Sequence, residues 1–183
     1  MINTPNKITV IRIFSVPAFI IAIIYGHRDL ALGIFCFSVV TDAIDGFVAR
    51  YYKKITKLGS FIDPLADKLL MVTSFLFLSF FGDIRIPFWI SILVVSREVI
   101  MSLGWTLIYL LTNCFSGDAL VIQPTILGKL NTVFQMLTIL LYLINFKFAY
   151  YIALIMIVVM ISSTFGYIIR GSRMVNGGKG EEA

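Results

Sequence analysis

The stretch from residue 41 to residue 70 reads TDAIDGFVARYYKKITKLGSFIDPLADKLL and lies between hydrophobic segments long enough to span a membrane. It holds four of the chain's ten acidic residues, namely Asp42, Asp45, Asp63 and Asp67. A carboxylate at membrane depth costs roughly 3 kcal/mol or more, so it marks a functional site by default. Such a cluster repels itself unless a cation neutralises it, and carboxylate ligands suit Mg²⁺, Mn²⁺ or Ca²⁺. The stretch predicts a divalent-metal site at a membrane surface.

The composition predicts an integral membrane protein. The 183 residues are 59% hydrophobic and 14% charged, with a mean hydropathy of +0.95. A soluble domain of this size could not bury so much apolar surface. We expect an all-α, polytopic protein with six transmembrane helices, each close to the ~20 residues that cross the hydrocarbon core. The expected spans are residues 8–25, 30–50, 60–81, 88–111, 127–144 and 148–169.

Positive charges predict the orientation of these spans. Most Lys and Arg residues fall at one set of helix ends, and only Arg28, Arg85 and Lys147 fall at the other. By the positive-inside rule, both termini and the aspartates face the cytoplasm, in the cytoplasmic (inner) membrane. The net charge of +5 then indicates contact with anionic lipid headgroups and no nucleic acid partner. Residues 1–170 are expected to form one membrane domain, and residues 171–183 a disordered polar cytoplasmic tail.

The spacing of the aspartates predicts one shared pocket. Asp42, Asp45 and Ala49 are spaced i, i+3, i+7, and Asp63 and Asp67 are spaced i, i+4, so each set shares a helix face. Two helices joined by a short basic loop can aim all four carboxylates into one pocket. Four carboxylates are enough for two divalent ions, which together can clamp a pyrophosphate.

The fixed residues between the aspartates also form a recognisable signature. Their order is Asp42-x2-Asp45-Gly46-x2-Ala49-Arg50-x8-Gly59-x3-Asp63-x3-Asp67. This spacing resembles the signature of the CDP-alcohol phosphotransferase family, with no element missing. The resemblance extends over most of the chain, from Pro5 to the last hydrophobic segment.

The resemblance implies an activity and a set of roles. The reaction is transfer of a phosphatidyl group from CDP-diacylglycerol to an alcohol, with release of CMP. Members of the family are commonly homodimers, and their partners include membrane lipids. The cofactors are two divalent cations, Mg²⁺ or Mn²⁺. One would be held by Asp42, Asp45 and Asp63, and the other by Asp42, Asp63 and Asp67. Asp67 is also implied as the general base. The residues implied for CDP binding are Asp45, Gly46, Ala49, Arg50, Gly59 and Ser60.

The acceptor is less sharply indicated. The opening PNKITVIRIFSVPAF and the segment GSFIDPLADKLL resemble the branch of the family whose acceptors carry glycerol, which favours glycerol 3-phosphate. Arg97 and Lys129 are then expected to bind the acceptor phosphate. Two cations typical of that branch are missing, because Gly104-Trp105 and Asn131 stand in their places. The segment PTILGKLNTVFQ also resembles the cardiolipin synthases of this family, so phosphatidylglycerol is the alternative acceptor.

Other interpretations explain less of the sequence. A divalent-cation transporter lined by acidic residues accounts for the carboxylates. It does not account for Gly46, Ala49-Arg50 and Gly59 at the family spacing. A non-catalytic lipid-binding scaffold does not account for a complete set of metal ligands. Arg97 and Glu98 also admit a purely structural interpretation, as a buried ion pair.

Overall fold

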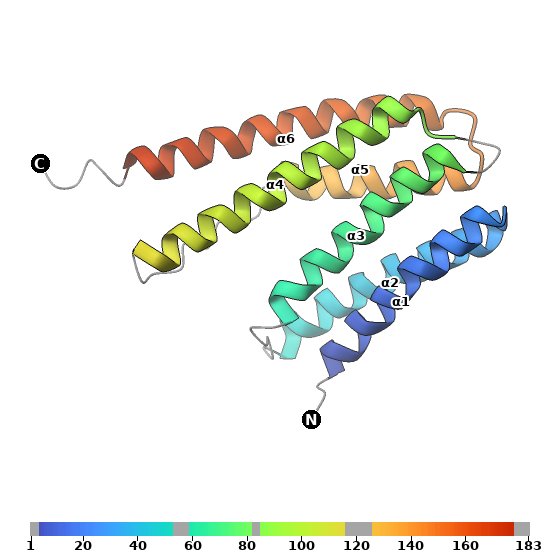
Figure 1. Ribbon diagram of the computed structural model, residues 1–183, viewed down its shortest axis with the longest axis horizontal. Coiled ribbons are helices and arrows are strands. Elements are labelled where there is room, and N and C mark those ends of the chain that lie inside the picture. The colour runs from blue at the N-terminus through green and yellow to red at the C-terminus, as the bar shows by residue number, and fades with distance from the viewer. Residues whose placement is uncertain (1–3, 53–58, 82–84, 116–125, 178–183) are drawn as a thin grey trace, which may run out of the picture.

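The computed structural model describes residues 4–52, 59–81, 85–115 and 126–177, with side chains described for residues 14–41, 68–81, 85–104 and 126–167. The described residues form six α-helices and no strand (Figure 1). In chain order they are α1 (Thr4–Ile24), α2 (Arg28–Tyr52), α3 (Gly59–Phe80), α4 (Phe88–Phe115), α5 (Ile126–Leu143) and α6 (Ala149–Gly177).

Each expected span corresponds to one helix, so the all-α prediction is confirmed. The clearest difference is at the C-terminus, where α6 continues to Gly177 although a disordered tail was expected from residue 171. Helix propagation adds one backbone hydrogen bond per residue and needs no apolar side chain. A helix can therefore extend beyond the hydrophobic segment that predicts it. The rest of the expected tail, residues 178–183, lies outside the described residues.

Two helices in the described part of the chain are long and apolar enough to cross a membrane. They cover residues 126–143 and 149–167, with mean hydropathies of 1.5 and 2.0. Shorter apolar helical stretches cover residues 14–24 and 68–80. Membrane crossing by all six helices therefore stays a prediction.

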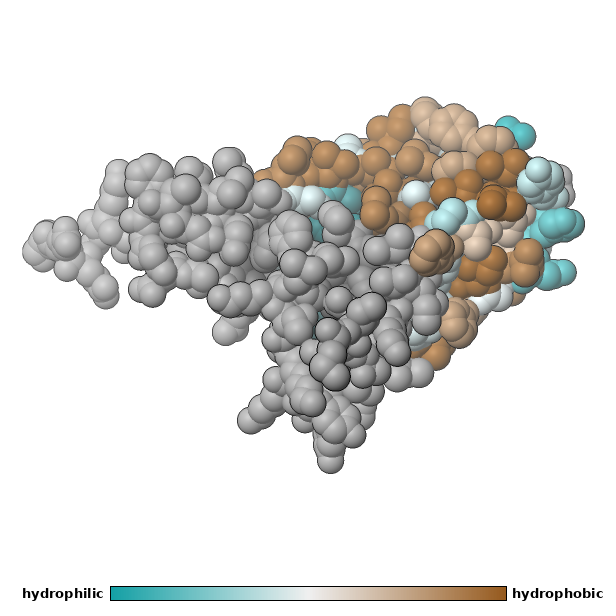
Figure 2. Space-filling view, turned by 60° about the horizontal axis from the view of Figure 1, so that its bottom comes forward, coloured by the Kyte–Doolittle hydropathy of each residue, from teal (hydrophilic) through white to brown (hydrophobic). Residues whose placement is uncertain are grey.

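The described surface is apolar around the helices. Figure 2 shows hydrophobic side chains over the described part of one face, with hydrophilic ones gathered at its right-hand end. Every helix contributes large exposed hydrophobic side chains, including Phe14, Phe37, Leu69, Ile100, Val133 and Val158. Such a contiguous apolar surface is rare on a soluble monomer and suits lipid contact.

The helices pack into one bundle, and the features at its two ends differ. α1 packs against α2 and α3, α3 packs against α4, and α5 packs against α6, while α2 and α3 also contact α5. At one end lie the short α1–α2 and α5–α6 connections, together with the C-terminus of α3 and the N-terminus of α4 (Figure 1). There the Arg28 guanidinium donates to the carbonyls of Tyr142 and Leu143 at 2.8 and 2.9 Å, which satisfies carbonyls at the C-terminus of α5. The motif residues belong to the opposite end.

Candidate active site

The predicted metal ligands lie on two helices, near helix ends that are at the same end of the bundle. Asp42 and Asp45 belong to the C-terminal part of α2, and Asp63 and Asp67 to the N-terminal turns of α3. Figure 1 shows these two helix ends close to each other, at the end opposite the α1–α2 connection. The four side chains lie outside the described ones, so their convergence on a metal stays a prediction.

The residues predicted to bind CDP follow the same division. Gly46, Ala49 and Arg50 belong to the last turns of α2, while Gly59 and Ser60 are the first residues of α3. Their side chains are also outside the described set. Among the described residues there is no group of three or more His, Cys, Asp or Glu side chains that could hold a metal ion.

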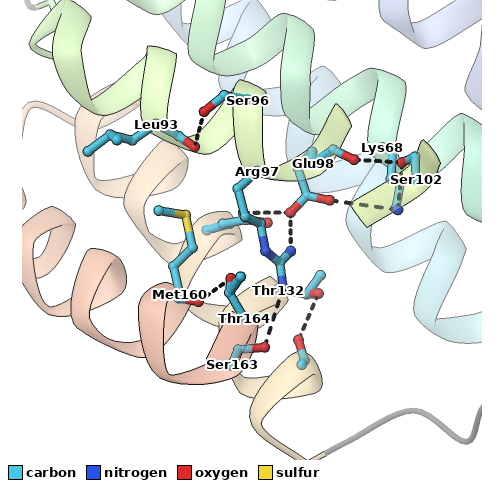
Figure 3. Close-up of polar contacts among 12 residues, drawn as sticks. Lys68, Leu93, Ser96, Arg97, Glu98, Ser102, Thr132, Met160, Ser163 and Thr164 are labelled. Carbon is cyan, nitrogen blue, oxygen red and sulfur yellow. Dashed lines mark hydrogen bonds and ion pairs between the residues drawn. The ribbon is translucent and has the colours of Figure 1, made fainter. Parts of the chain in front are cut away.

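A buried polar cluster lies between α3, α4 and α5 (Figure 3). Its centre is the carboxylate of Glu98, which is 6% exposed and forms an ion pair with the neighbouring Arg97. Gln135 Nε2 donates to Glu98 Oε1 at 3.1 Å, and Lys68 Nζ lies 3.9 Å from Glu98 Oε2. Lys68 Nζ also donates to Ser102 Oγ at 2.8 Å. Two cations thus share one carboxylate, so the cluster keeps a single net positive charge.

Arg97 combines a structural contact with an accessible face. The predicted ion pair between Arg97 and Glu98 is present. Arg97 Nη2 is 3.4 Å from Ser163 Oγ on α6, and the buried Arg97 Nε has no hydrogen-bond partner. Arg97 also lines an open cavity of about 240 Å³ between α4 and α6, whose other lining residues include Ile100, Met160 and Phe165. Phosphate binding by Arg97 stays a prediction.

Lys129 is the second residue predicted to bind the acceptor. It is exposed near the N-terminus of α5, and no described contact joins its side chain to that of Arg97. Gly104, which stands where a cation was expected, has open space around it, because an added Cβ would meet no atom within 4 Å. Asn131, which stands in place of the second lysine, is fully buried.

A larger cavity lies at the other end of the bundle. Its volume is about 910 Å³, and its lining includes His27, Arg28, Asp29 and Asn145. It contains none of the predicted site residues. Its position beside the α1–α2 and α5–α6 connections separates it from the motif.

Sequence reasoning missed part of the polar cluster. Lys68 was not considered, although it directly follows Asp67. Gln135 was not singled out either, and its contact with Glu98 joins residues 37 apart in sequence. The available signal was the i, i+4 spacing of Asn131 and Gln135, which puts two amides on one face of an apolar helix.

These features define a class of protein: a helical bundle with an apolar exterior, a buried charged cluster and an acidic motif divided between two helix ends. Comparison with known proteins is more specific. The sequence profile of the CDP-alcohol phosphatidyltransferase family matches residues 2–165. The chain belongs to this family.

Three relatives illustrate the range of names within the family. A probable phosphatidylglycerophosphate synthase of Mycobacterium tuberculosis is 38% identical over 103 residues, which cover 53% of this chain and 48% of the relative. A CDP-diacylglycerol–glycerol-3-phosphate 3-phosphatidyltransferase of Bacillus subtilis is 32% identical over 154 residues, covering 76% of this chain and 75% of the relative. A probable CMP-forming cardiolipin synthase of Drosophila melanogaster is 32% identical over 150 residues, covering 76% and 46%. The chain thus spans about half the length of the mycobacterial relative.

Proposed function

We propose that this chain transfers the phosphatidyl group of CDP-diacylglycerol to a glycerol-type acceptor and releases CMP. The family match over residues 2–165 carries the proposal. We favour glycerol 3-phosphate as the acceptor. The Bacillus subtilis relative, which aligns over three quarters of each chain, is named for transfer to glycerol 3-phosphate. The apolar exterior and the two helices that are long and apolar enough to cross a membrane are what we expect of an enzyme with a lipid substrate.

The acidic motif fits divalent cations by its donor chemistry. Asp42, Asp45, Asp63 and Asp67 would hold two Mg²⁺ or Mn²⁺ ions, since these ions prefer carboxylate oxygens. Bound there, the ions would supply positive charge against the pyrophosphate and the departing CMP.

The side chains of this chain then have separate roles. The Asp67 carboxylate accepts the proton of the acceptor hydroxyl. The cytidine diphosphate is held by Asp45, Gly46, Ala49, Arg50, Gly59 and Ser60, at the ends of α2 and α3. Arg97 and Lys129 bind the acceptor phosphate, since both are cations.

A second candidate is cardiolipin synthesis from phosphatidylglycerol. Its acceptor phosphate is a diester with one negative charge, so it needs fewer cations than glycerol 3-phosphate. The neutral Asn131 and the open space around Gly104 favour it, because neither supplies the extra cation that a phosphomonoester attracts. The similarity to the Drosophila melanogaster relative agrees with this alternative.

We also propose the arrangement in the membrane. All six helices cross the cytoplasmic membrane, both termini and the motif face the cytoplasm, and two copies of the chain form a homodimer. The basic residues at the motif end and the sparse cations at the other end support the orientation. With Cys36 and Cys114 replaced by serine, an impermeant maleimide should label Lys147→Cys on intact cells and should not label Lys54→Cys. The reverse pattern contradicts the orientation, and a monomeric mass in detergent contradicts the dimer.

The function is tested on purified protein in detergent with Mg²⁺ and CDP-diacylglycerol. Glycerol 3-phosphate, phosphatidylglycerol, inositol phosphate and serine are offered separately while CMP and lipid product are measured. We expect phosphatidylglycerophosphate from glycerol 3-phosphate, whereas cardiolipin from phosphatidylglycerol alone would select the second candidate. Divalent-cation flux into sealed vesicles without CMP release would favour the transporter.

A further inference from the structure

The buried face of α5 carries two side-chain amides, of which only one has a hydrogen-bond partner. Asn131 is 0% exposed and Gln135 is 2% exposed. Gln135 donates to the Glu98 carboxylate, but neither Oδ1 nor Nδ2 of Asn131 has a hydrogen-bond partner. Each buried polar group left without a partner costs about 1–3 kcal/mol. A leucine of similar shape would avoid that cost, so the amide calls for a partner that the described contacts do not supply, either an ordered water or a ligand group.

The position of Asn131 relates it to the acidic motif. It lies one helical turn before Gln135, which is about 6 Å along α5 toward its N-terminus. That end of α5 is the end at which α3 begins, and the two helices are in contact (Figure 1). Gln135 and Lys68 both contact Glu98, and Lys68 directly follows Asp67 on α3. Asn131 therefore lies near the level of the α3 turn that bears the proposed base.

The chemistry of the side chain selects the kind of partner. A carboxamide has two N–H donors and one carbonyl acceptor, and a hydroxyl both donates and accepts. A phosphate dianion only accepts, and it is better matched by cations such as Arg97. A neutral polyol hydroxyl can satisfy both the Oδ1 and an Nδ2 hydrogen of Asn131.

We propose that Asn131 is a specificity-determining residue that binds the non-reacting hydroxyl of the acceptor's glycerol group. The inference rests on the proposed function and deepens it, because both candidate acceptors carry a glycerol with a second hydroxyl. A site that hydrogen-bonds a substrate hydroxyl rejects an analogue that lacks it, because its own polar groups are then left unpaired. Asn131 is therefore expected to distinguish glycerol from a propanediol group.

The test uses the purified full chain and two matched acceptor pairs. Glycerol 3-phosphate is compared with 3-hydroxypropyl phosphate, and phosphatidylglycerol with phosphatidyl-1,3-propanediol. In the wild type, loss of the second hydroxyl should lower kcat/KM about tenfold or more, which corresponds to one hydrogen bond. In Asn131→Leu the two members of a pair should differ by less than about twofold.

Gln135→Leu provides the matched control on the same helix face. It removes a buried amide that already has a partner within the chain. It should lower the thermal unfolding midpoint and keep the tenfold discrimination. Asn131→Leu should have the opposite effects, with an unfolding midpoint equal to or above that of the wild type. Asn131→Ala serves as a second variant if the leucine does not fit.

Several results would overturn the inference. Tenfold discrimination retained in both Asn131 variants would show that the amide does not read the hydroxyl. Equal use of glycerol and propanediol acceptors by the wild type would show the same, and an ordered water would then be the partner of the amide. Absence of CMP release from the wild type would contradict the proposed function. The inference would then be tested by acceptor binding alone, measured as a shift of the unfolding midpoint. Glycerol 3-phosphate should raise the unfolding midpoint of the wild type and not that of Asn131→Leu, whereas equal shifts would overturn the inference.

Discussion

Gln135 Nε2 donates a hydrogen bond of 3.1 Å to Glu98 Oε1, which joins α5 to α4 inside the bundle. The same carboxylate forms ion pairs with Arg97 on α4 and Lys68 on α3. One buried acidic group thus connects three helices beside the turn that carries Asp67. This cluster supports the part of the bundle on which the proposed site depends.

Replacement of Gln135 by leucine should weaken this connection. A hydrogen bond to a charged group contributes about 1.5–3 kcal/mol, so the free energy of unfolding should fall by about that amount. Thermal unfolding in detergent measures the effect. Met136→Leu, a change of similar size at the neighbouring partly buried residue, is the control. An unchanged midpoint in Gln135→Leu would contradict the importance of this hydrogen bond.

Removal of Glu98 should be more severe than removal of Gln135. Glu98→Ala leaves the largely buried Arg97 guanidinium without its carboxylate, and loss of one partner of a buried pair costs about 3–5 kcal/mol. The yield of monodisperse protein and the unfolding midpoint should both fall. The double variant Arg97→Met with Glu98→Leu should recover part of this stability, because it removes the buried Arg97–Glu98 pair and leaves only the partly exposed Lys68 ammonium without a carboxylate. A double variant no more stable than Glu98→Ala would contradict this explanation.

The six helices could be predicted from the sequence, because each corresponds to one apolar segment of roughly 20 residues. The helical residues 171–177 could not, since their polar sequence GSRMVNG carries no such signal. The Arg97–Glu98 pair was accessible to sequence reasoning because its members are adjacent. The contacts of Lys68 with Ser102 and of Gln135 with Glu98 were not, because they depend on which helices pack together.

Neutralising one motif carboxylate should abolish turnover without unfolding the protein. Asp63→Asn keeps the side-chain shape but removes a charged ligand of the proposed cations, so CMP release should fall at least about a thousandfold. Asp29→Asn is the matched control, because Asp29 is an exposed acidic residue in the first turn of α2, at the opposite end of that helix. Wild-type turnover in a purified Asp63→Asn protein would remove Asp63 from the proposed site.

Two exposed lysines test the acceptor assignment. Lys129 lies near the start of α5, and Lys147 lies beyond its other end, 6.0 Å from the centre of the Phe148 ring. Lys129→Gln should raise the KM for glycerol 3-phosphate about tenfold, since a charge-assisted contact to phosphate is lost. Lys147→Gln should leave that KM unchanged. Equal KM values in the two variants would remove Lys129 from the acceptor site.

The most direct test of the central claim is CMP release from CDP-diacylglycerol by the purified chain, before and after removal of divalent cations. With Mg²⁺ and glycerol 3-phosphate, the account predicts CMP and phosphatidylglycerophosphate in equal amounts. It predicts no CMP after treatment with EDTA, and recovery when Mg²⁺ or Mn²⁺ is restored. CMP release that persists in EDTA would contradict the role of the aspartates, and no CMP with any glycerol-type acceptor would contradict the proposed reaction.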